Sequence, residues 1–218
     1  MKKIIILSFA AVIAIAGCKK QHTTISNVVT ASYPKVTITG SPYVSIPVGG
    51  TFVPPNATAY DSFYRETESV VKNLGSLDNT TPGLYVIAYT AKNKYGFEGS
   101  SYVYVAVTDI SDTLNLAGIY FRLSDPHRIA NVTKLARGLF RTDNVGGADI
   151  TDSTTGPRLS AVFAVTTPAS LTFGSQVTTR GPLSSSLESL SLVPSDTTMS
   201  YSISEQDFGT QVRTFVKQ

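Results

Sequence analysis

Hydrophobic and polar residues alternate over short stretches of this chain, and turn-forming residues separate the stretches. In residues 84–91 every second side chain is aromatic or aliphatic, and residues 101–108 repeat the pattern. This period of two places one face of each segment against a core, which predicts β-strands. The segment Asn-Lys-Tyr-Gly at residues 93–96 is the expected turn between them, so we expect the two strands to form a β-hairpin.

Shorter segments of the same kind precede this hairpin. Residues 36–39 and 43–48 are expected to form an opening strand pair, and residues 51–53 the next strand. Turn residues recur at the short spacing that is typical of β-sandwiches. Tyr85 stands at the position of a tyrosine corner, whose hydroxyl bonds to nearby backbone. We therefore predict a sandwich over residues 33–109.

A link at residues 110–115 leads to a second region, residues 116–218. Its strands are expected at residues 118–123, 128–135, 138–143, 159–166, 170–173, 189–193, 199–203 and 211–216. Short strands with Gly, Pro, Asp and Ser breaks predict an antiparallel meander, closed or half-closed into a barrel. The Ser-rich segment 182–188 is expected to be a mobile loop.

The chain begins with a segment that has the layout of an export signal. Lys2 and Lys3 form a positive stretch, residues 4–15 are almost entirely apolar, and small residues precede Cys18. The apolar run is too short to cross the roughly 30 Å hydrocarbon core of a bilayer as a stable helix. Three interpretations of this segment stay open: an uncleaved anchor helix, a plain signal peptide with an incidental cysteine, and the lipid attachment at Cys18 described next.

The sequence Ile-Ala-Gly-Cys at residues 15–18 resembles the lipobox of bacterial lipoproteins. The resemblance implies that a diacylglyceryl group is attached to the thiol of Cys18 and that residues 1–17 are removed as a signal peptide. Residues 18–32 then form a polar tether between the lipid and the first folded region. Two or three acyl chains anchor a protein stably in a lipid membrane, because each buried methylene contributes about 0.8 kcal/mol.

A further resemblance is carried by residues 46–52 (IPVGGTF), 57–61 (ATAYD), 81–85 (TPGLY) and 89–91 (YTA). These segments look like the bacterial immunoglobulin-like repeats of exported lipoproteins in Bacteroidota. The resemblance implies an immunoglobulin-like sandwich over residues 33–109. Such domains most often serve as spacers, since a fold does not by itself imply a function.

The second region carries a resemblance of its own, at residues 116–120 (LAGIY), 138–143 (GLFRTD) and 209–215 (GTQVRTF). It is similar to the C-terminal domains of Bacteroidota lipoproteins from polysaccharide-utilisation gene clusters. The expected fold class is therefore all-β: an immunoglobulin-like sandwich followed by a second antiparallel β meander or barrel-like domain.

Composition narrows the function further. With 218 residues, 42% of them hydrophobic and 15% charged, the chain is neither largely disordered nor a helical bundle. One cysteine excludes an internal disulfide, and two histidines leave little for a metal site, so we predict no metal and no cofactor. Basic residues are scattered among acidic ones and form no stripe, so no nucleic-acid partner is expected.

Catalysis can be judged from the residues that it requires. His127 is the only histidine in a predicted folded region, and it lies in the polar segment 125–128, which we expect to be a solvated turn. The acidic residues stand in no recognisable glycosidase motif. We predict that the protein is not an enzyme.

Two aromatic clusters are the candidates for ligand binding, one before the long hairpin and one at its turn. The candidate residues are Tyr60, Phe63, Tyr64, Arg65, Tyr95 and Phe97. Sugar rings stack their apolar faces on aromatic side chains and bond their hydroxyls to fixed polar groups, so carbohydrate is the expected ligand. Loop packing is the competing interpretation of both clusters, and their spacing in the sequence does not require them to meet.

Two functions therefore stay open. The first is a non-catalytic module that binds carbohydrate in a polysaccharide-uptake system; the second is a spacer or docking subunit of an outer-membrane protein complex, without a ligand of its own. The protein is expected to be lipid-anchored in the outer membrane. Residues 19–22 depart from the acidic address for the cell surface in Bacteroidota lipoproteins, so surface-exposed and periplasm-facing placements both stay open.

Three triplets that begin with Asp resemble the acceptor pattern for O-glycosylation in Bacteroidota. The candidate acceptors are Thr113, Ser153 and Thr197. A glycan on Thr113 would keep the link at residues 110–115 extended.

Overall fold

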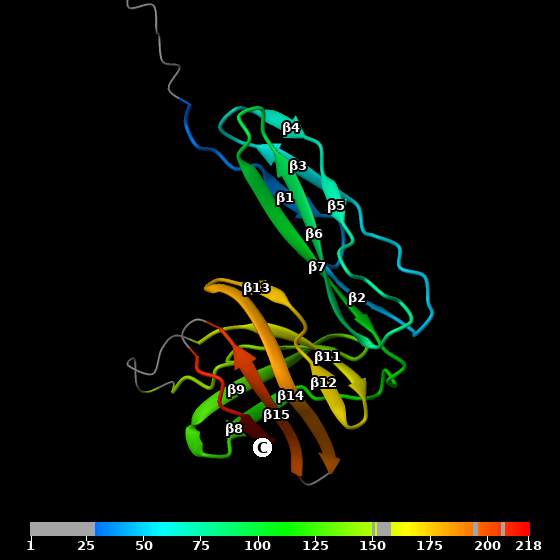
Figure 1. The fold of residues 1–218 in the computed structure, drawn as a ribbon, viewed down its shortest axis with the longest axis vertical. Helices are drawn as coiled ribbons and strands as arrows, with labels where there is room; N and C mark the ends of the chain where they lie inside the picture. The colour runs from blue at the N-terminus through cyan, green and yellow to red at the C-terminus, as the bar shows by residue number, and fades with distance from the viewer. Residues whose placement is uncertain (1–28, 150, 152–157, 194–195, 206–207) are drawn as a thin grey trace, which may run out of the picture. The chain divides into compact units, whose positions relative to one another are not determined.

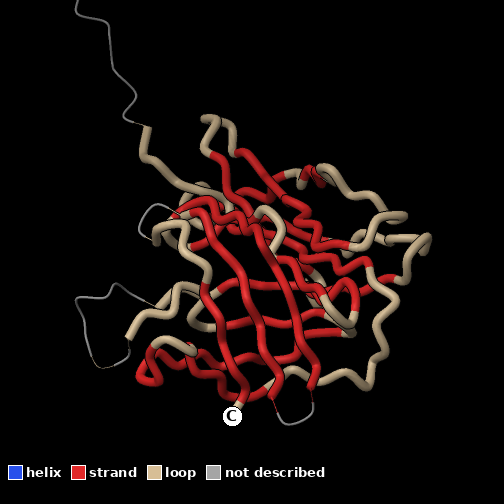
Figure 2. Tube along the Cα trace, turned by 60° about the horizontal axis from the view of Figure 1, so that its bottom comes forward, coloured by secondary structure: helices blue, strands red, loops and turns tan. Residues whose placement is uncertain are grey.

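The computed structural model describes residues 29–149, 151, 158–193, 196–205 and 208–218. The predicted signal peptide at residues 1–17, the lipidation site Cys18 and the candidate acceptor Ser153 lie outside the described residues. Within them the chain forms strands, turns and loops and no helix (Figure 2), which confirms the all-β prediction. Residues 32–218 form one compact unit.

Residues 35–107 form a sandwich of two sheets. One sheet has the order β1-β3-β4, with β1 at Lys35–Ile38, β3 at Ala57–Asp61 and β4 at Glu66–Glu68. The other has the order β2-β7-β6-β5, with β2 at Tyr43–Ile46, β7 at Glu98–Val107, β6 at Gly83–Lys92 and β5 at Val71–Asn73. Buried side chains from both sheets, among them Val36, Ala59, Ile87, Tyr89 and Val103, meet in one core.

The hairpin β6–β7, prominent in Figure 1, confirms the strongest sequence pattern. The two strands pair in antiparallel register from Gly83 opposite Val107 to Lys92 opposite Glu98. Tyr85 also behaves as predicted, since its hydroxyl donates to the carbonyl of Thr81 at 2.9 Å. This tyrosine corner ties the start of β6 to the segment before it.

Other strand predictions in this region are wrong. Segments 36–39 and 43–48 do not pair with each other: β1 pairs with β3, and β2 pairs in parallel with β7. Alternation predicts a strand and its faces but does not identify its partner. Residues 51–53 form no strand, because two prolines follow directly and lack the N–H that a ladder needs; Val53 is 77% exposed.

The C-terminal part of the chain forms a nine-stranded sheet with the order β12-β11-β10-β9-β8-β16-β15-β14-β13. Its strands are β8 (Gly118–Arg122), β9 (Asp125–Ala136), β10 (Leu139–Thr142), β11 (Ala161–Thr167), β12 (Ser170–Thr172), β13 (Gln176–Thr178), β14 (Gly181–Val193), β15 (Asp196–Ser204) and β16 (Arg213–Lys217). The sheet curls until β14 meets the β11–β12 turn, where Leu190 N–H donates to the carbonyl of Ala169 at 2.9 Å. This half-barrel confirms the predicted antiparallel barrel-like region.

The prediction of a mobile loop at residues 182–188 is wrong. These residues belong to β14, which pairs with β15 from Ser184 to Val193. Leu183 is buried, whereas Ser184 and Ser186 are exposed to solvent. The pairing shifts between Ser186 and Ser189, where Leu187 has a φ of 55°. Serine on a solvated strand face resembles loop composition, which explains the error.

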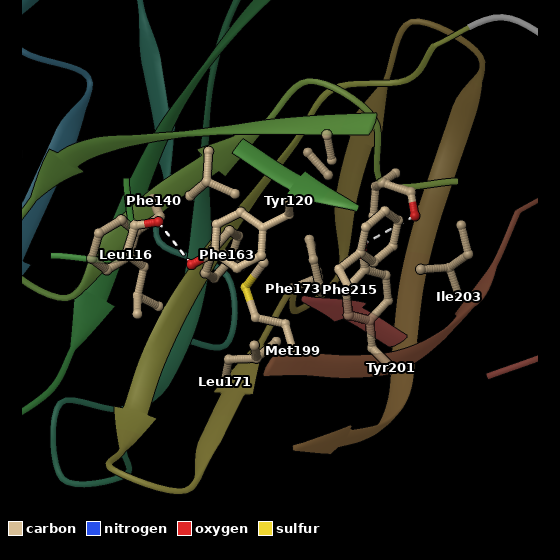
Figure 3. Packing of buried hydrophobic residues seen from close by; sticks show 14 of the residues in the cluster. Leu116, Tyr120, Phe140, Phe163, Leu171, Phe173, Met199, Tyr201, Ile203 and Phe215 are labelled. Carbon is tan, nitrogen blue, oxygen red and sulfur yellow. Dashed lines mark hydrogen bonds between the residues drawn. The ribbon is translucent and has the colours of Figure 1, made fainter. Parts of the chain in front are cut away.

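A chain of aromatic rings fills the half-barrel (Figure 3). The ring centroids lie 5.6 Å apart between Phe140 and Phe163, 5.3 Å between Phe163 and Phe173, and 4.6 Å between Phe173 and Tyr201. Phe215 continues the chain 5.8 Å from Tyr201. Each such pair contributes about 0.5–1.5 kcal/mol beyond the area that it buries, so this chain links β10 and β11 with β15 and β16 through the core.

The sandwich and the half-barrel share a buried apolar junction. Leu84 and Ala106 of the hairpin β6–β7 cluster with Leu139 and Val162 of the half-barrel. Beside this cluster the hydroxyl of Thr108 donates to the carbonyl of Val165 at 2.7 Å. The two regions are therefore held by packed side chains and a buried hydrogen bond as well as by the connecting segment.

Gly174 lies at this junction in a backbone conformation that favours glycine. Its φ is +56°, and a Cβ atom added to it would lie 2.7 Å from the carbonyl oxygen of Leu84. The sandwich therefore approaches the half-barrel too closely here for any side chain.

Replacing Phe173 with alanine should remove the centre of the aromatic chain. We expect the F173A variant to lose about 3–5 kcal/mol of unfolding free energy in a urea titration, because the ring is fully buried. Leu123→Ala is the matched control, since that side chain is 71% exposed. A loss below about 1 kcal/mol for Phe173→Ala would contradict the packing described.

Replacing Gly174 with alanine should strain the junction. We expect a loss of about 1–3 kcal/mol in unfolding free energy, from the unfavourable φ and from the close carbonyl of Leu84. Thermal melts of this variant are compared with those of Gly209→Ala. That variant is the control, because a Cβ at position 209 meets nothing within 4 Å. Equal melting temperatures for the two variants would show that the close approach is absent.

Candidate functional site

The structure brings the two predicted aromatic clusters together at one end of the sandwich. The β3–β4 turn carries Phe63 and Tyr64, and the β6–β7 turn carries Tyr95. The ring centroids of Tyr64 and Tyr95 lie 4.8 Å apart, and Phe63 lies 4.9 Å from Tyr64. Phe97, in the second turn, contacts Tyr33 at 5.6 Å. We call these residues, Tyr33, Phe63, Tyr64, Tyr95 and Phe97, the aromatic tip.

The carboxylate of Asp61 fixes the first of the two turns. Asp61 is fully buried at the end of β3, and its Oδ1 accepts hydrogen bonds from the backbone N–H groups of Phe63 and Tyr64 at 3.0 and 3.1 Å. The hydroxyl of Ser32 donates to the same oxygen at 2.6 Å. This arrangement sets the path of the turn that presents the two rings.

The side chain of Asn93 fixes the second turn and joins it to the first. Its Oδ1 accepts from the backbone N–H groups of Tyr95 and Phe97 at 3.0 and 3.1 Å. Its Nδ2 donates to the carbonyl of Ser32 at 2.8 Å and to Asp61 Oδ2 at 2.9 Å. The donor to Asp61 is buried, so one hydrogen bond directly connects the two turns.

These hydrogen bonds also set the charge of Asp61. Burial alone would raise the pKa of its carboxyl group, but the hydrogen bonds from Asn93, from Ser32 and from the backbone of Tyr64 and Phe63 together lower this pKa below its ordinary value. The group is therefore ionised at neutral pH.

Lys94 adds a cation to the aromatic tip. Its Nζ lies 2.7 Å from Glu66 Oε1 and is placed 5.4 Å and 5.5 Å from the ring centroids of Tyr64 and Tyr95. The hydrogen bond to Glu66 raises the pKa of Lys94, despite an opposing effect of desolvation. The ammonium group is attracted to the electron-rich faces of both rings, so Lys94 helps to orient them.

The exposed ring surface is what the tip offers to a ligand. Tyr33 is 63% exposed, Phe63 59% and Tyr95 46%. Of the two remaining candidates, Arg65 is exposed in the first turn with a φ of 56°. Tyr60 is 48% exposed on β3, opposite Lys35 and Thr67 in the neighbouring strands. Exposed aromatic rings can stack on the apolar face of a sugar, and neighbouring polar or charged groups can hold its hydroxyls.

Asp61, Asn93, Lys94 and Tyr33 shape the aromatic tip although none of them was predicted as a site residue. The signal for Asp61 and Asn93 was present, because both are turn residues whose side chains bond to backbone two residues ahead. Their hydrogen bond to each other spans 32 positions and leaves no local pattern.

Other predicted sites lie elsewhere. Thr113 is exposed and its hydroxyl bonds to that of Ser111 at 2.8 Å, and Thr197 lies half-buried on β15. His127 is exposed, as expected, but it lies on strand β9 and not in a turn; its backbone N–H donates to Asp125 Oδ1 at 3.0 Å. Within the described ranges, no group of three or more His, Cys, Asp or Glu side chains lies close enough together to hold a metal ion. The described residues also contain no helix that is long and apolar enough to cross a membrane.

Comparison with known proteins identifies the sandwich. A family model described as bacterial surface protein, Ig-like domain, matches residues 36–107, about a third of the chain. This match confirms the immunoglobulin-like nature of the first region. A search of curated proteins found no match.

A solved structure, the lipoprotein BT2262 from Bacteroides thetaiotaomicron, is similar to this chain at 20% identity. The alignment covers 85% of this chain and 100% of that chain, with a TM-score of 0.36.

Replacing Asp61 with asparagine should destabilise the protein in a pH-dependent way. Because the folded pKa lies below the unfolded value of about 3.9, the contribution of Asp61 is fully present above that value and is lost as the pH falls through the folded pKa. Thermal melts from pH 7 to pH 2 should therefore show the largest gap between wild type and Asp61→Asn at neutral pH, and a shrinking gap below about pH 4. A gap that stays constant with pH would contradict the ionised, hydrogen-bonded carboxylate.

Proposed function

We propose that this protein is a non-catalytic surface lipoprotein module that binds carbohydrate through its aromatic tip. The observation that carries the proposal is the convergence of Tyr64 and Tyr95, whose rings lie 4.8 Å apart although they come from different turns. The match of residues 36–107 to a bacterial surface immunoglobulin-like domain supports a surface role.

Anchoring through lipid is part of the proposal. Cys18 carries the acyl chains, residues 1–17 are removed, and the protein is held at the outer membrane. The motif at residues 15–18 supports this step. Two or more acyl chains on one cysteine give the stable attachment that a binding module on a membrane requires.

The chemistry of the tip suits binding more than turnover. Its carboxylates are committed to structure: Asp61 is buried and accepts four hydrogen bonds, and Glu66 is held by Lys94 at 2.7 Å. A glycosidase needs two carboxyl groups that face the scissile bond. The exposed part of the tip consists instead of the rings of Tyr33, Phe63 and Tyr95, which suit recognition.

A spacer or docking subunit of an outer-membrane complex is the second candidate. The observation that favours it is the buried junction of Leu84, Ala106, Leu139 and Val162, which holds the sandwich and the half-barrel together. A spacer must keep a fixed length, and a packed apolar junction provides it.

Affinity electrophoresis separates the two candidates. The protein, purified in detergent, is run through gels that contain polysaccharides of differing sugar composition, and we expect at least one to retard it. Tyr95→Ala should reduce the retardation roughly two- to ten-fold, the effect of one aromatic contact, whereas Tyr95→Phe keeps the ring and should retain it. Retardation that is the same for wild type and Tyr95→Ala would place binding elsewhere, and no retardation by any polysaccharide would leave the spacer as the function.

A further inference from the structure

A second candidate site lies in a cleft between the sandwich and the half-barrel. We call it the junction cleft; its volume is about 110 Å³, and residues that line it include Tyr43, Tyr104, Arg141, Ser160, Gln176 and Val177. From Phe97 at the aromatic tip to Tyr104 the chain runs seven residues along an extended strand, roughly 23 Å. The cleft is therefore separate from the tip.

One wall of the cleft is a pair of tyrosine rings. Tyr43 of β2 and Tyr104 of β7 are direct partners in the parallel strand pair. Their ring centroids lie 5.9 Å apart and their planes differ by 26°, so the two rings stack on each other and form one aromatic wall. Both residues are half-buried. Burial raises the pKa of Tyr104, and the neighbouring hydroxyls of Tyr43 and Tyr102 raise it further. The hydroxyl of Tyr104 is therefore neutral and can donate a hydrogen bond.

The opposite wall provides a rigid surface. Gln176 is buried, and its Nε2 donates to the carbonyls of Val162 and Phe173 at 2.7 Å each. Its Oε1 accepts from the N–H of Val162 at 3.0 Å. Because the amide is fully used inside the protein, Gln176 shapes the cleft and leaves ligand bonds to other groups.

Arg141 is the charged group of the cleft. It is exposed on β10, and over the residues described its guanidinium makes no hydrogen bond or ion pair. The nearest acid along the strand, Asp143, is held by Arg158 at 2.9 Å and by Asn131 at 2.8 Å. A full positive charge therefore stands beside two aromatic rings without an internal carboxylate to neutralise it.

We propose that the junction cleft binds the carboxylate-bearing sugar of an acidic polysaccharide. The guanidinium of Arg141 pairs with the carboxylate in the two-pronged geometry that arginine favours, while the rings of Tyr43 and Tyr104 contact the apolar side of the sugar. Ligand pockets for whole small molecules span roughly 300–1,000 Å³, so a cleft of about 110 Å³ takes one charged edge of a sugar chain.

The inference goes beyond carbohydrate binding at the tip, because it assigns a second site and a charge preference. A calorimetric titration uses a galacturonic-acid oligosaccharide and the same oligosaccharide with its carboxyl groups methyl-esterified. We expect the protein in detergent to bind the free acid at least about ten-fold more tightly than the ester, as a charge-assisted hydrogen bond implies. Added salt should weaken the binding of the acid and leave that of the ester unchanged.

Variants locate the preference. Arg141→Gln should reduce affinity for the acid about ten-fold or more without affecting the ester, and Arg141→Lys should retain only part of the preference. Lys35→Gln is the matched control, because it removes one positive charge from β1 and leaves the cleft intact. Tyr43→Ala should weaken binding of acid and ester alike, since it removes part of the ring wall.

Two results would overturn the inference: equal affinity of the wild type for acid and ester, or an acid preference that Arg141→Gln leaves unchanged. Tyr95→Ala distinguishes this site from the tip. If the acid preference persists in Tyr95→Ala, the cleft binds on its own whatever the fate of the tip proposal. If Tyr95→Ala abolishes the preference while Arg141→Gln retains it, the acidic sugar binds only at the tip and the cleft has no role.

Discussion

The hydrogen bond from Asn93 to the buried carboxylate of Asp61 joins two turns that lie 32 positions apart in the chain. Each residue also bonds to the backbone of its own turn, so the same side chains shape the turns and connect them. A buried carboxylate without these partners would be costly, because desolvation penalises its charge. The positions of Tyr64 and Tyr95 therefore depend on a polar network beneath the aromatic rings rather than on ring contacts alone.

The rest of the fold supplies the frame for that network. The hairpin β6–β7 runs from the aromatic tip at one end to the apolar junction at the other, where Leu84 and Ala106 pack against the half-barrel. The aromatic chain through Phe163 and Phe173 stiffens the half-barrel behind the junction. Two recognition surfaces on one compact unit can engage a polymer together, which raises its effective affinity without any new contact.

The sequence predicted those features that depend on local pattern, and it missed those that depend on distant partners. Alternation located β6 and β7, and one tyrosine at the right offset located the corner at Tyr85. The parallel partner of β2 is more than fifty residues away, so no local sequence pattern indicates it. The contact between Tyr64 and Tyr95 also has no local sequence signal. The serines of β14 suggested a loop, because a solvated strand face and a loop tolerate the same residues.

Amide hydrogen exchange in the two turns tests the central claim most directly. The backbone N–H groups of Phe63, Tyr64, Tyr95 and Phe97 lie in surface turns, yet all four donate to Asp61 or Asn93. We predict that they exchange slowly in the wild type, and that Asn93→Ala accelerates exchange at Phe63 and Tyr64 as well as in its own turn. Fast exchange of these amides in the wild type, or an Asn93→Ala effect confined to Tyr95 and Phe97, would contradict a network that joins the turns.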